Sequence, residues 1–474
     1  MSVIAARQRA AARAERIARR LTPEEFSSAM LGRILALLTL VAWAGGLVIG
    51  FETALTVLTC IGIVVMLAGL KWPGVGLLGL GMLTTLDTLI RGFLASDSFL
   101  PFNTFNYLLL IAMVWFLPVL VRINDVHSRL MQALLLVLGL ELFFSDAKMS
   151  GIMHILNAFI IFAMIAYYAR AEHIDHAVYW MGIVSGLIAA VGGAVYYLQI
   201  DTLAYLNPNA WAKFPVTGII MACLAFPVAG KFRFGRLALM LLAVVCFAWT
   251  FLSGSRGNML IGGFGLLFLL VWERRFSWKI FMSALMVGGM VVLSAFFVEQ
   301  QTYAISRLTK IFDPRYNLNQ VTSGRANIAE LGLQLFLRNP LGVGTGNFMS
   351  EISTVSEFSD SAVAAHSGWI KVLAENGVPG ILLLGAFVAS FAVVGLLRRN
   401  REAFLIGMLT SSILAVAFIS TEFQGKNLWF LAGAAAVMLH REHYREIVAK
   451  AGALLVRRRP RAVRDWRGQR EPGD

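Results

Sequence analysis

Charged side chains are scarce in this sequence. Asp, Glu, Lys and Arg make up 14% of the 474 residues, whereas apolar residues make up 58% and the mean hydropathy is +0.72. An ordinary soluble domain carries about 25% charged residues. The composition therefore excludes a water-soluble globular protein and predicts an integral membrane protein.

Motifs that would bind a metal ion or a nucleotide are also missing. The sequence has no His-Glu-x-x-His, no Asp-x-Asp pair, no paired-cysteine motif and no glycine-rich nucleotide fingerprint. The three cysteines, Cys60, Cys223 and Cys246, all fall inside apolar stretches, where neither a loop disulfide nor a metal cluster is expected. Nothing here supports a metal-dependent or nucleotide-sugar enzyme, and we expect no cofactor.

Apolar runs recur along most of the chain. Runs of roughly 15 to 23 residues can cross a hydrocarbon core of about 30 Å as helices, some of them with help from interfacial flanks. About fourteen such runs occur, at 34–50, 53–70, 74–92, 104–121, 130–144, 151–169, 177–199, 214–229, 236–252, 258–272, 279–298, 378–397, 403–420 and 426–440. The predicted fold class is all-α, a polytopic membrane protein with about 12–14 transmembrane helices.

Basic residues indicate which side of the membrane each end faces. The first thirty residues are rich in arginine and no small-residue cleavage site follows a short apolar run, so we expect a cytoplasmic arm rather than a secretory signal. With fourteen spans and an inner N-terminus, the inner segments hold 30 of the 41 Lys and Arg residues, as the positive-inside rule requires. Both termini are then cytoplasmic. The net charge of +14 is expected to face anionic lipid headgroups, not nucleic acid.

The chain divides into five parts on this topology. They are a basic arm at 1–33, a transmembrane bundle at 34–298, a long outer loop at 299–377, C-terminal transmembrane helices at 378–440 and a basic tail at 441–474. A connection as long as 299–377 inside a compact protein is usually functional. We therefore expect the working surface there.

Histidine provides one candidate for proton transfer. On this topology only His154 and His366 lie on or near the outer side, and His366 directly precedes a predicted short helix in 367–380, with Lys371 and Glu375 one turn apart. A helix N-terminus disfavours the imidazolium, which would keep the ring neutral and able to accept a proton. The alternative is a loop histidine that only makes hydrogen bonds.

Arginines on the outer side provide candidates for anion binding. Arg256 lies among small residues in 253–257, and the others on this face are Arg91, Arg307, Arg315, Arg325 and Arg338. The planar guanidinium binds diphosphate oxygens in a bidentate way and stays charged at the membrane edge. The alternative for any one of them is an interfacial side chain that reaches out to water.

Two further segments of the outer loop have recognisable patterns. Apolar residues at 328, 331 and 335 predict a helix over 326–338 on or near the membrane surface. The following run, 340–348, contains Gly342, Gly344 and Gly346; as a phosphate signal it is weak, and a tight turn is the safer prediction. Asn207-Pro208-Asn209 on another outer segment is likewise predicted to be a turn.

The order of these motifs resembles a known family. The motifs are Asn207-Pro208-Asn209, Ser255-Arg256-Gly257, Ser323-Gly324-Arg325, Gly342-Val343-Gly344-Thr345-Gly346-Asn347-Phe348, and His366 followed by Leu373-Ala374-Glu375-Asn376-Gly377-Val378-Pro379-Gly380. In this order they resemble the bacterial O-antigen ligase and O-antigen/exopolysaccharide polymerase superfamily. The first 200 residues resemble it only as a set of spans.

The resemblance implies a fold, a reaction and a site. It implies a GT-C-type glycosyltransferase in the bacterial inner membrane that takes a glycan from undecaprenyl diphosphate at the periplasmic face and passes it to an acceptor hydroxyl, without a metal. Arg256 and Arg325 match the arginines that bind the diphosphate, and His366 matches the residue that acts on the acceptor. Supporting roles are expected for Asn209, Arg338, Gly344, Asn347 and Glu375. Family members often have Asn after this histidine, where Ser367 stands here.

Three readings stay open from the sequence. A polymerase is slightly favoured over a ligase because about fourteen spans resemble the polymerases more. The alternative of another class is a transporter or flippase for a polyprenyl-linked saccharide, which would prefer ionisable groups near the membrane midplane. Asp87 and Glu141 lie in apolar spans but close to their outer ends. Expected partners are the undecaprenyl-diphosphate-linked donor, the glycan acceptor and the bilayer. Partners among other polysaccharide-assembly proteins stay open.

Overall fold

The computed structural model describes residues 23–93, 104–170, 174–198, 208–253, 255–273, 315, 325–355, 367–420 and 425–440. This part of the chain is built from helices and contains no strand. Within these residues, eight helical stretches are long and apolar enough to cross a membrane, at Ser28–Ile49, Phe51–Ala68, Gly151–Ala169, Asp175–Val195, Ala212–Ala229, Gly235–Leu252, Gly368–Leu397 and Arg401–Ile419. The predicted class, an all-α polytopic membrane protein, is confirmed.

The helices follow the predicted spans closely. Their bounds are α2 Pro23–Ile49, α3 Phe51–Ala68, α4 Pro73–Phe93, α5 Thr104–Leu120, α6 Val126–Leu142, α7 Lys148–Ala158, α8 Ile160–Arg170, α9 Asp175–Leu198, α10 Pro208–Ala229, α11 Gly235–Leu252, α12 Arg256–Trp272, α16 Arg325–Arg338, α17 Phe348–Val355, α18 Gly368–Leu397, α19 Arg401–Ser420 and α20 Lys426–Leu439. The predicted span 279–298 lies outside the described residues. The predicted span 151–169 falls on two helices, α7 and α8, which meet at Phe159.

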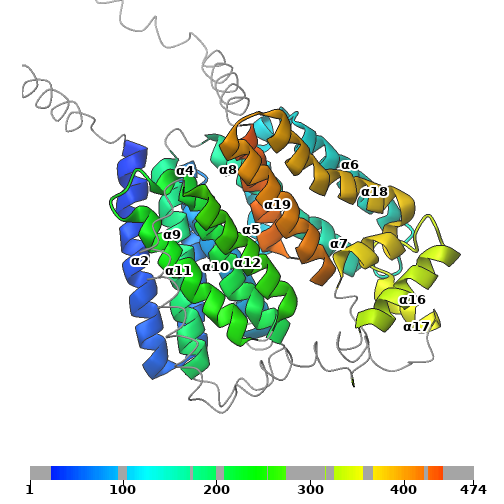
Figure 1. The fold of residues 1–474 in the computed structure, drawn as a ribbon, viewed down its shortest axis with the longest axis horizontal. Helices are drawn as coiled ribbons and strands as arrows, with labels where there is room; N and C mark the ends of the chain where they lie inside the picture. The colour runs from blue at the N-terminus through cyan, green and yellow to red at the C-terminus, as the bar shows by residue number, and fades with distance from the viewer. Residues whose placement is uncertain are drawn as a thin grey trace, which may run out of the picture.

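Burial separates the central helices from those at the surface. Every residue of α20 except Met438 is buried, as expected for a helix that is apolar on all sides. In contrast, α2 exposes large apolar side chains such as Leu37, Val41 and Val48. In a membrane this face of α2 would contact lipid. Figure 1 shows α2, α9 and α11 on one side of the molecule and α6, α18 and α19 on the other.

Small residues let neighbouring helices approach closely. Between α18 and α19, a Cβ atom on Gly407 would lie 2.3 Å from the backbone oxygen of Phe391, and one on Gly395 would lie 3.2 Å from the Cα of Gly407. Small residues at such crossings are typical of membrane helices, where packing rather than the hydrophobic effect drives association. The three cysteines lie on α3, α10 and α11 as free thiols.

A buried ion pair joins two helix ends in the bundle. The Nζ of Lys426, the first residue of α20, lies 2.6 Å from the Oδ1 of Asp87 near the end of α4, and both residues are buried. Next to it, Asn427 donates a hydrogen bond to the Oγ1 of Thr217 on α10. Polar contacts therefore tie α4, α10 and α20 together at one end of the bundle.

A smaller unit of short helices lies at one end of the bundle, beside the start of α18 (Figure 1). Its own apolar cluster consists of Ile328, Leu335, Phe348, Ile352 and Ala374, contributed by α16, α17 and α18. The helix predicted over 326–338 is confirmed as α16, which buries the predicted residues 328 and 335. Its location at a membrane surface stays a prediction.

Candidate functional site

The start of α18 carries the first part of the candidate site. The helix begins at Gly368, and the side chain of Ser367 caps it by accepting a hydrogen bond from the backbone N–H of Ile370. This confirms the helix predicted directly after His366. The side chain and backbone of His366 itself lie outside the described residues.

A break at Gly377 changes the hydrogen bonding of α18. Gly377 has φ 56° and ψ −150°, so the backbone kinks between its first nine residues and the long apolar remainder. Beyond the kink the N–H of Val378 donates to the carbonyl of Pro340 at 3.0 Å instead of to the preceding turn. The carbonyls of Ala374 and Glu375 accept from Val343 at 3.1 Å and Gly344 at 2.9 Å. The kink thus exposes helix carbonyls that bind the glycine-rich segment.

The glycine-rich segment is a tight turn, as predicted. Gly342, Gly344 and Gly346 have φ values of 95°, 97° and 96°, which residues with a Cβ rarely adopt. Space also requires glycine, because a Cβ on Gly342 would lie 2.2 Å from the carbonyl oxygen of Glu375. The turn therefore serves close backbone contact with α18, and its described N–H groups at 343 and 344 are used for that contact.

Glu375 connects α18 to α17. Its carboxylate is buried, forms an ion pair with Lys371 at 3.8 Å, and accepts a hydrogen bond from the backbone N–H of Phe348 at 3.1 Å. Phe348 is the first residue of α17. A carboxylate at a helix N-terminus satisfies a free N–H group and interacts favourably with the helix dipole. Glu375 thus fixes α17 against α18.

Asn347 connects the glycine-rich turn to the α6–α7 loop. The Oδ1 of Asn347 accepts from the hydroxyl of Ser145 and from the backbone N–H of Ala147, both at 2.9 Å. Its Nδ2 donates to the carbonyl of Val343 at 2.9 Å. One buried amide therefore holds two loops that are 200 residues apart in the sequence.

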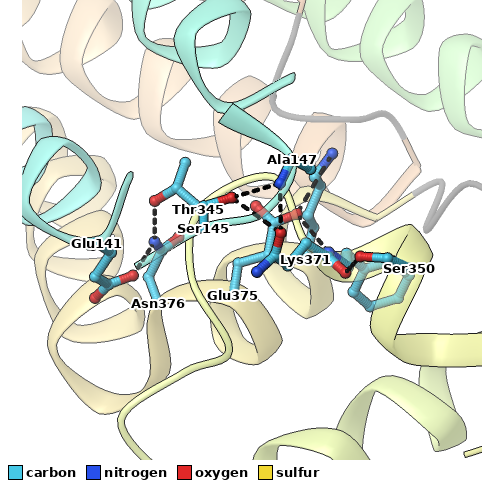
Figure 2. Close-up of polar contacts among 10 residues, drawn as sticks. Glu141, Ser145, Ala147, Thr345, Ser350, Lys371, Glu375 and Asn376 are labelled. Carbon is cyan, nitrogen blue, oxygen red and sulfur yellow. Dashed lines mark hydrogen bonds and ion pairs between the residues drawn. The ribbon is translucent and has the colours of Figure 1, made fainter. Parts of the chain in front are cut away.

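Asn376 makes the corresponding contact with α6 itself. Its Nδ2 donates to the carboxylate of Glu141 and to the Oγ1 of Thr345, the latter at 2.8 Å. The Thr345 hydroxyl in turn donates to the carbonyl of Leu138 at 3.0 Å. Figure 2 shows Glu141, Asn376 and Thr345 pointing toward one another. We call Glu141, Ser145, Thr345, Asn347, Lys371, Glu375 and Asn376 the polar network.

Sequence reasoning missed several members of the polar network. From the sequence, Ser145, Thr345 and Asn376 carry no predicted role, and Glu141 is only an acidic residue near the end of an apolar span. The position of Glu141 is the sequence feature that points to this network, because an ionisable group in an apolar span marks a functional or structural contact. Of the predicted supporting residues, Gly344, Asn347 and Glu375 are brought together here.

The two predicted diphosphate-binding arginines each begin a helix. Arg256 is the first residue of α12, after the N-cap Ser255, whose hydroxyl accepts from the side chain of Asn258 at 2.9 Å. Arg325 is the first residue of α16, and both arginines are partly exposed. The dipole and free N–H groups of a helix N-terminus favour anions. Each arginine therefore adds a guanidinium to an end of a helix that already attracts negative charge.

The other predicted residues have different settings. Arg338 is exposed at the last position of α16. The turn predicted at Asn207-Pro208-Asn209 is wrong for its last two residues, because α10 begins at Pro208 and includes Asn209. Proline suits the first helical position, where no N–H is needed. In the described part of the chain, no three His, Cys, Asp or Glu side chains form a group that could hold a metal ion.

Comparison with known proteins finds a family match over part of the chain. The described helices form a polytopic membrane bundle that carries a small helical unit rich in buried polar contacts. Residues 237–385, from α11 through the kink of α18, match the family model described as O-antigen ligase. This match confirms, over residues 237–385, the resemblance to the O-antigen ligase-related superfamily that the motifs predict. A search of curated proteins found no match.

Proposed function

We propose that the protein is a GT-C-type glycosyltransferase that transfers a glycan from undecaprenyl diphosphate to an acceptor hydroxyl at the periplasmic face of the inner membrane. The family match supports an enzyme of the O-antigen ligase and polymerase type. Both termini are then cytoplasmic, and the loop 299–377 faces the periplasm. Within this class we favour a polymerase, on the predicted number of spans.

One observation carries the proposal. Arg256 and Arg325, far apart in the sequence, are both first residues of helices within the matched region. Each supplies a planar fork of donors beside the positive end of a helix, which suits the oxygens of a diphosphate. Two such cations are what a donor with a diphosphate leaving group needs.

The chemistry needs few groups. The acceptor oxygen attacks C1 of the donor sugar, the bond from C1 to the diphosphate oxygen breaks, and the acceptor proton passes to His366 acting as general base. Arg256 and Arg325 neutralise the charge that develops on the leaving undecaprenyl diphosphate. Direct attack inverts the anomeric centre. We also propose supporting roles for Asn209 and Arg338 at the periplasmic face.

A transporter without chemistry is less well supported. Such a protein would use ionisable groups near the membrane midplane. The buried pair of Asp87 and Lys426 instead joins the last turns of α4 to the first residue of α20. Its position at helix ends favours a packing role.

Deletion of the gene, followed by analysis of glycan and lipid, tests the proposal. Loss of long chains with single units still attached to the lipopolysaccharide core would indicate a polymerase. Accumulation of full-length polymer on undecaprenyl diphosphate would indicate a ligase. Unchanged glycans and carrier lipids in the deletion strain would contradict both.

A further inference from the structure

The first nine residues of α18 are held from two sides by adjacent side chains. Glu375 binds the N-terminus of α17, and Asn376 binds Glu141 on α6. Consecutive residues on a helix point about 100° apart, so these contacts restrain rotation of the helix as well as its position. The segment ends at the kink of Gly377, so the long remainder of α18 does not impose its own direction on it.

The contacts with α6 are concentrated at one end of that helix. Glu141 is in its last turn, the Leu138 carbonyl lies one turn earlier, and Ser145 and Ala147 follow in the α6–α7 loop. Their partners are Asn376, Thr345 and Asn347. All of them belong to the turn and helix that immediately surround the kink. The end of α6 therefore fixes the position of the start of α18 through these hydrogen bonds.

We propose that Glu141, through Asn376 and Thr345, is a positioning residue for the transfer reaction, because it sets the start of α18, the helix that follows the proposed base His366 in the sequence. The inference rests on the proposed function. A helix is a stiff rod, and only about 12 Å of it separate Asn376 from Gly368. A rotation at Asn376 is therefore transmitted to Gly368 at the start of the helix.

The role predicts which kinetic constant changes. The proposed donor-binding residue Arg256 lies on α12, a different helix from those that Glu141 contacts. Arg325 begins α16, which packs against the start of α18, so a shift of α18 would also reach this donor contact. Loss of the Glu141 contact should therefore lower kcat by a larger factor than it raises the KM for the donor. A misplacement of about 1 Å can lower a rate on the order of 10²-fold.

The experiment compares Glu141→Ala, Glu141→Gln and the control Asp146→Ala in the full chain, reconstituted in nanodiscs. Lipid-linked glycan extracted from cells that lack the protein is the substrate, and released undecaprenyl diphosphate is quantified at several donor concentrations. Glu141→Gln keeps an oxygen that accepts from Asn376, so it should keep most of the rate. Asp146 is an exposed acid on the same α6–α7 loop and should be replaceable.

A lower kcat in Glu141→Ala, with a smaller change in KM and rescue by Gln, would support the positioning role. Wild-type kcat in Glu141→Ala would overturn it, and so would equal losses in Ala and Gln, since the hydrogen bond would then not matter. If Glu141→Ala fails to fold, the same test compares Thr345→Val with Thr345→Ser. Only Ser keeps the hydroxyl, so kcat should fall in Thr345→Val and be retained in Thr345→Ser. No release of undecaprenyl diphosphate by the wild-type chain would instead refute the proposed function, and the inference with it.

Discussion

Removal of one charge from the buried pair of Asp87 and Lys426 should destabilise the bundle strongly. The two charged atoms lie 2.6 Å apart, and the side chains of Lys426 and Asp87 are only 2% and 11% exposed. At an effective dielectric constant of about 20, this separation corresponds to an attraction of about 6 kcal/mol. In Lys426→Met the buried carboxylate of Asp87 loses the ammonium at 2.6 Å, and removal of one partner from a buried pair costs about 3–5 kcal/mol.

The double variant separates charge from packing. Asp87→Asn combined with Lys426→Met removes both charges, so it should regain most of the stability lost in the single variant. Lys231→Met is the control, because Lys231 pairs with Asp175 on the exposed surface, where an ion pair contributes at most about 1 kcal/mol. The assay is equilibrium unfolding of the full chain in mixed micelles, followed by tryptophan fluorescence. Equal stabilities of Lys426→Met and Lys231→Met would contradict this prediction, and so would a double variant that is no more stable than Lys426→Met.

Three further substitutions test the site. His366→Ala should lower transfer by about 10²–10⁴-fold in a chain that still inserts and folds, as loss of a general base does; near-normal glycan in the complemented deletion strain would contradict the proposed base. Arg256→Lys and Arg325→Lys should each weaken use of the donor by about tenfold or more, seen as a higher KM, because a point charge cannot replace the bidentate fork; full activity in both would mean that charge alone suffices. Gly342→Ala should lower the unfolding temperature, because its φ is 95° and a Cβ there would lie 2.2 Å from the carbonyl oxygen of Glu375. Gly385→Ala is the control, since a Cβ there meets nothing within 4 Å. Equal unfolding temperatures of the two variants would contradict the need for glycine in the turn.

The sequence predicted the fold class and most helices because apolar runs and helix stop signals are local. The helix at 325–338, the helix after Ser367 and the glycine-rich turn all follow from patterns within fifteen residues. The contact between Glu141 and Asn376 could not be predicted in this way, because the two residues are 235 positions apart. The start of α10 was missed for a local reason: proline opens helices as readily as it forms turns, and the sequence alone did not decide between them.

The contact between Asn347 and the α6–α7 loop has a consequence for assembly. During synthesis, Ser145 and Ala147 leave the ribosome about 200 residues before Asn347. The end of α6 therefore enters the membrane before its polar partners exist, and Glu141 must stay hydrated until Asn376 arrives. A chain that stops before residue 376 would contain most of the bundle, but Glu141 at the end of α6 would lack its contact with Asn376. Completion of the site is thus among the last steps of folding, after most helices have been inserted.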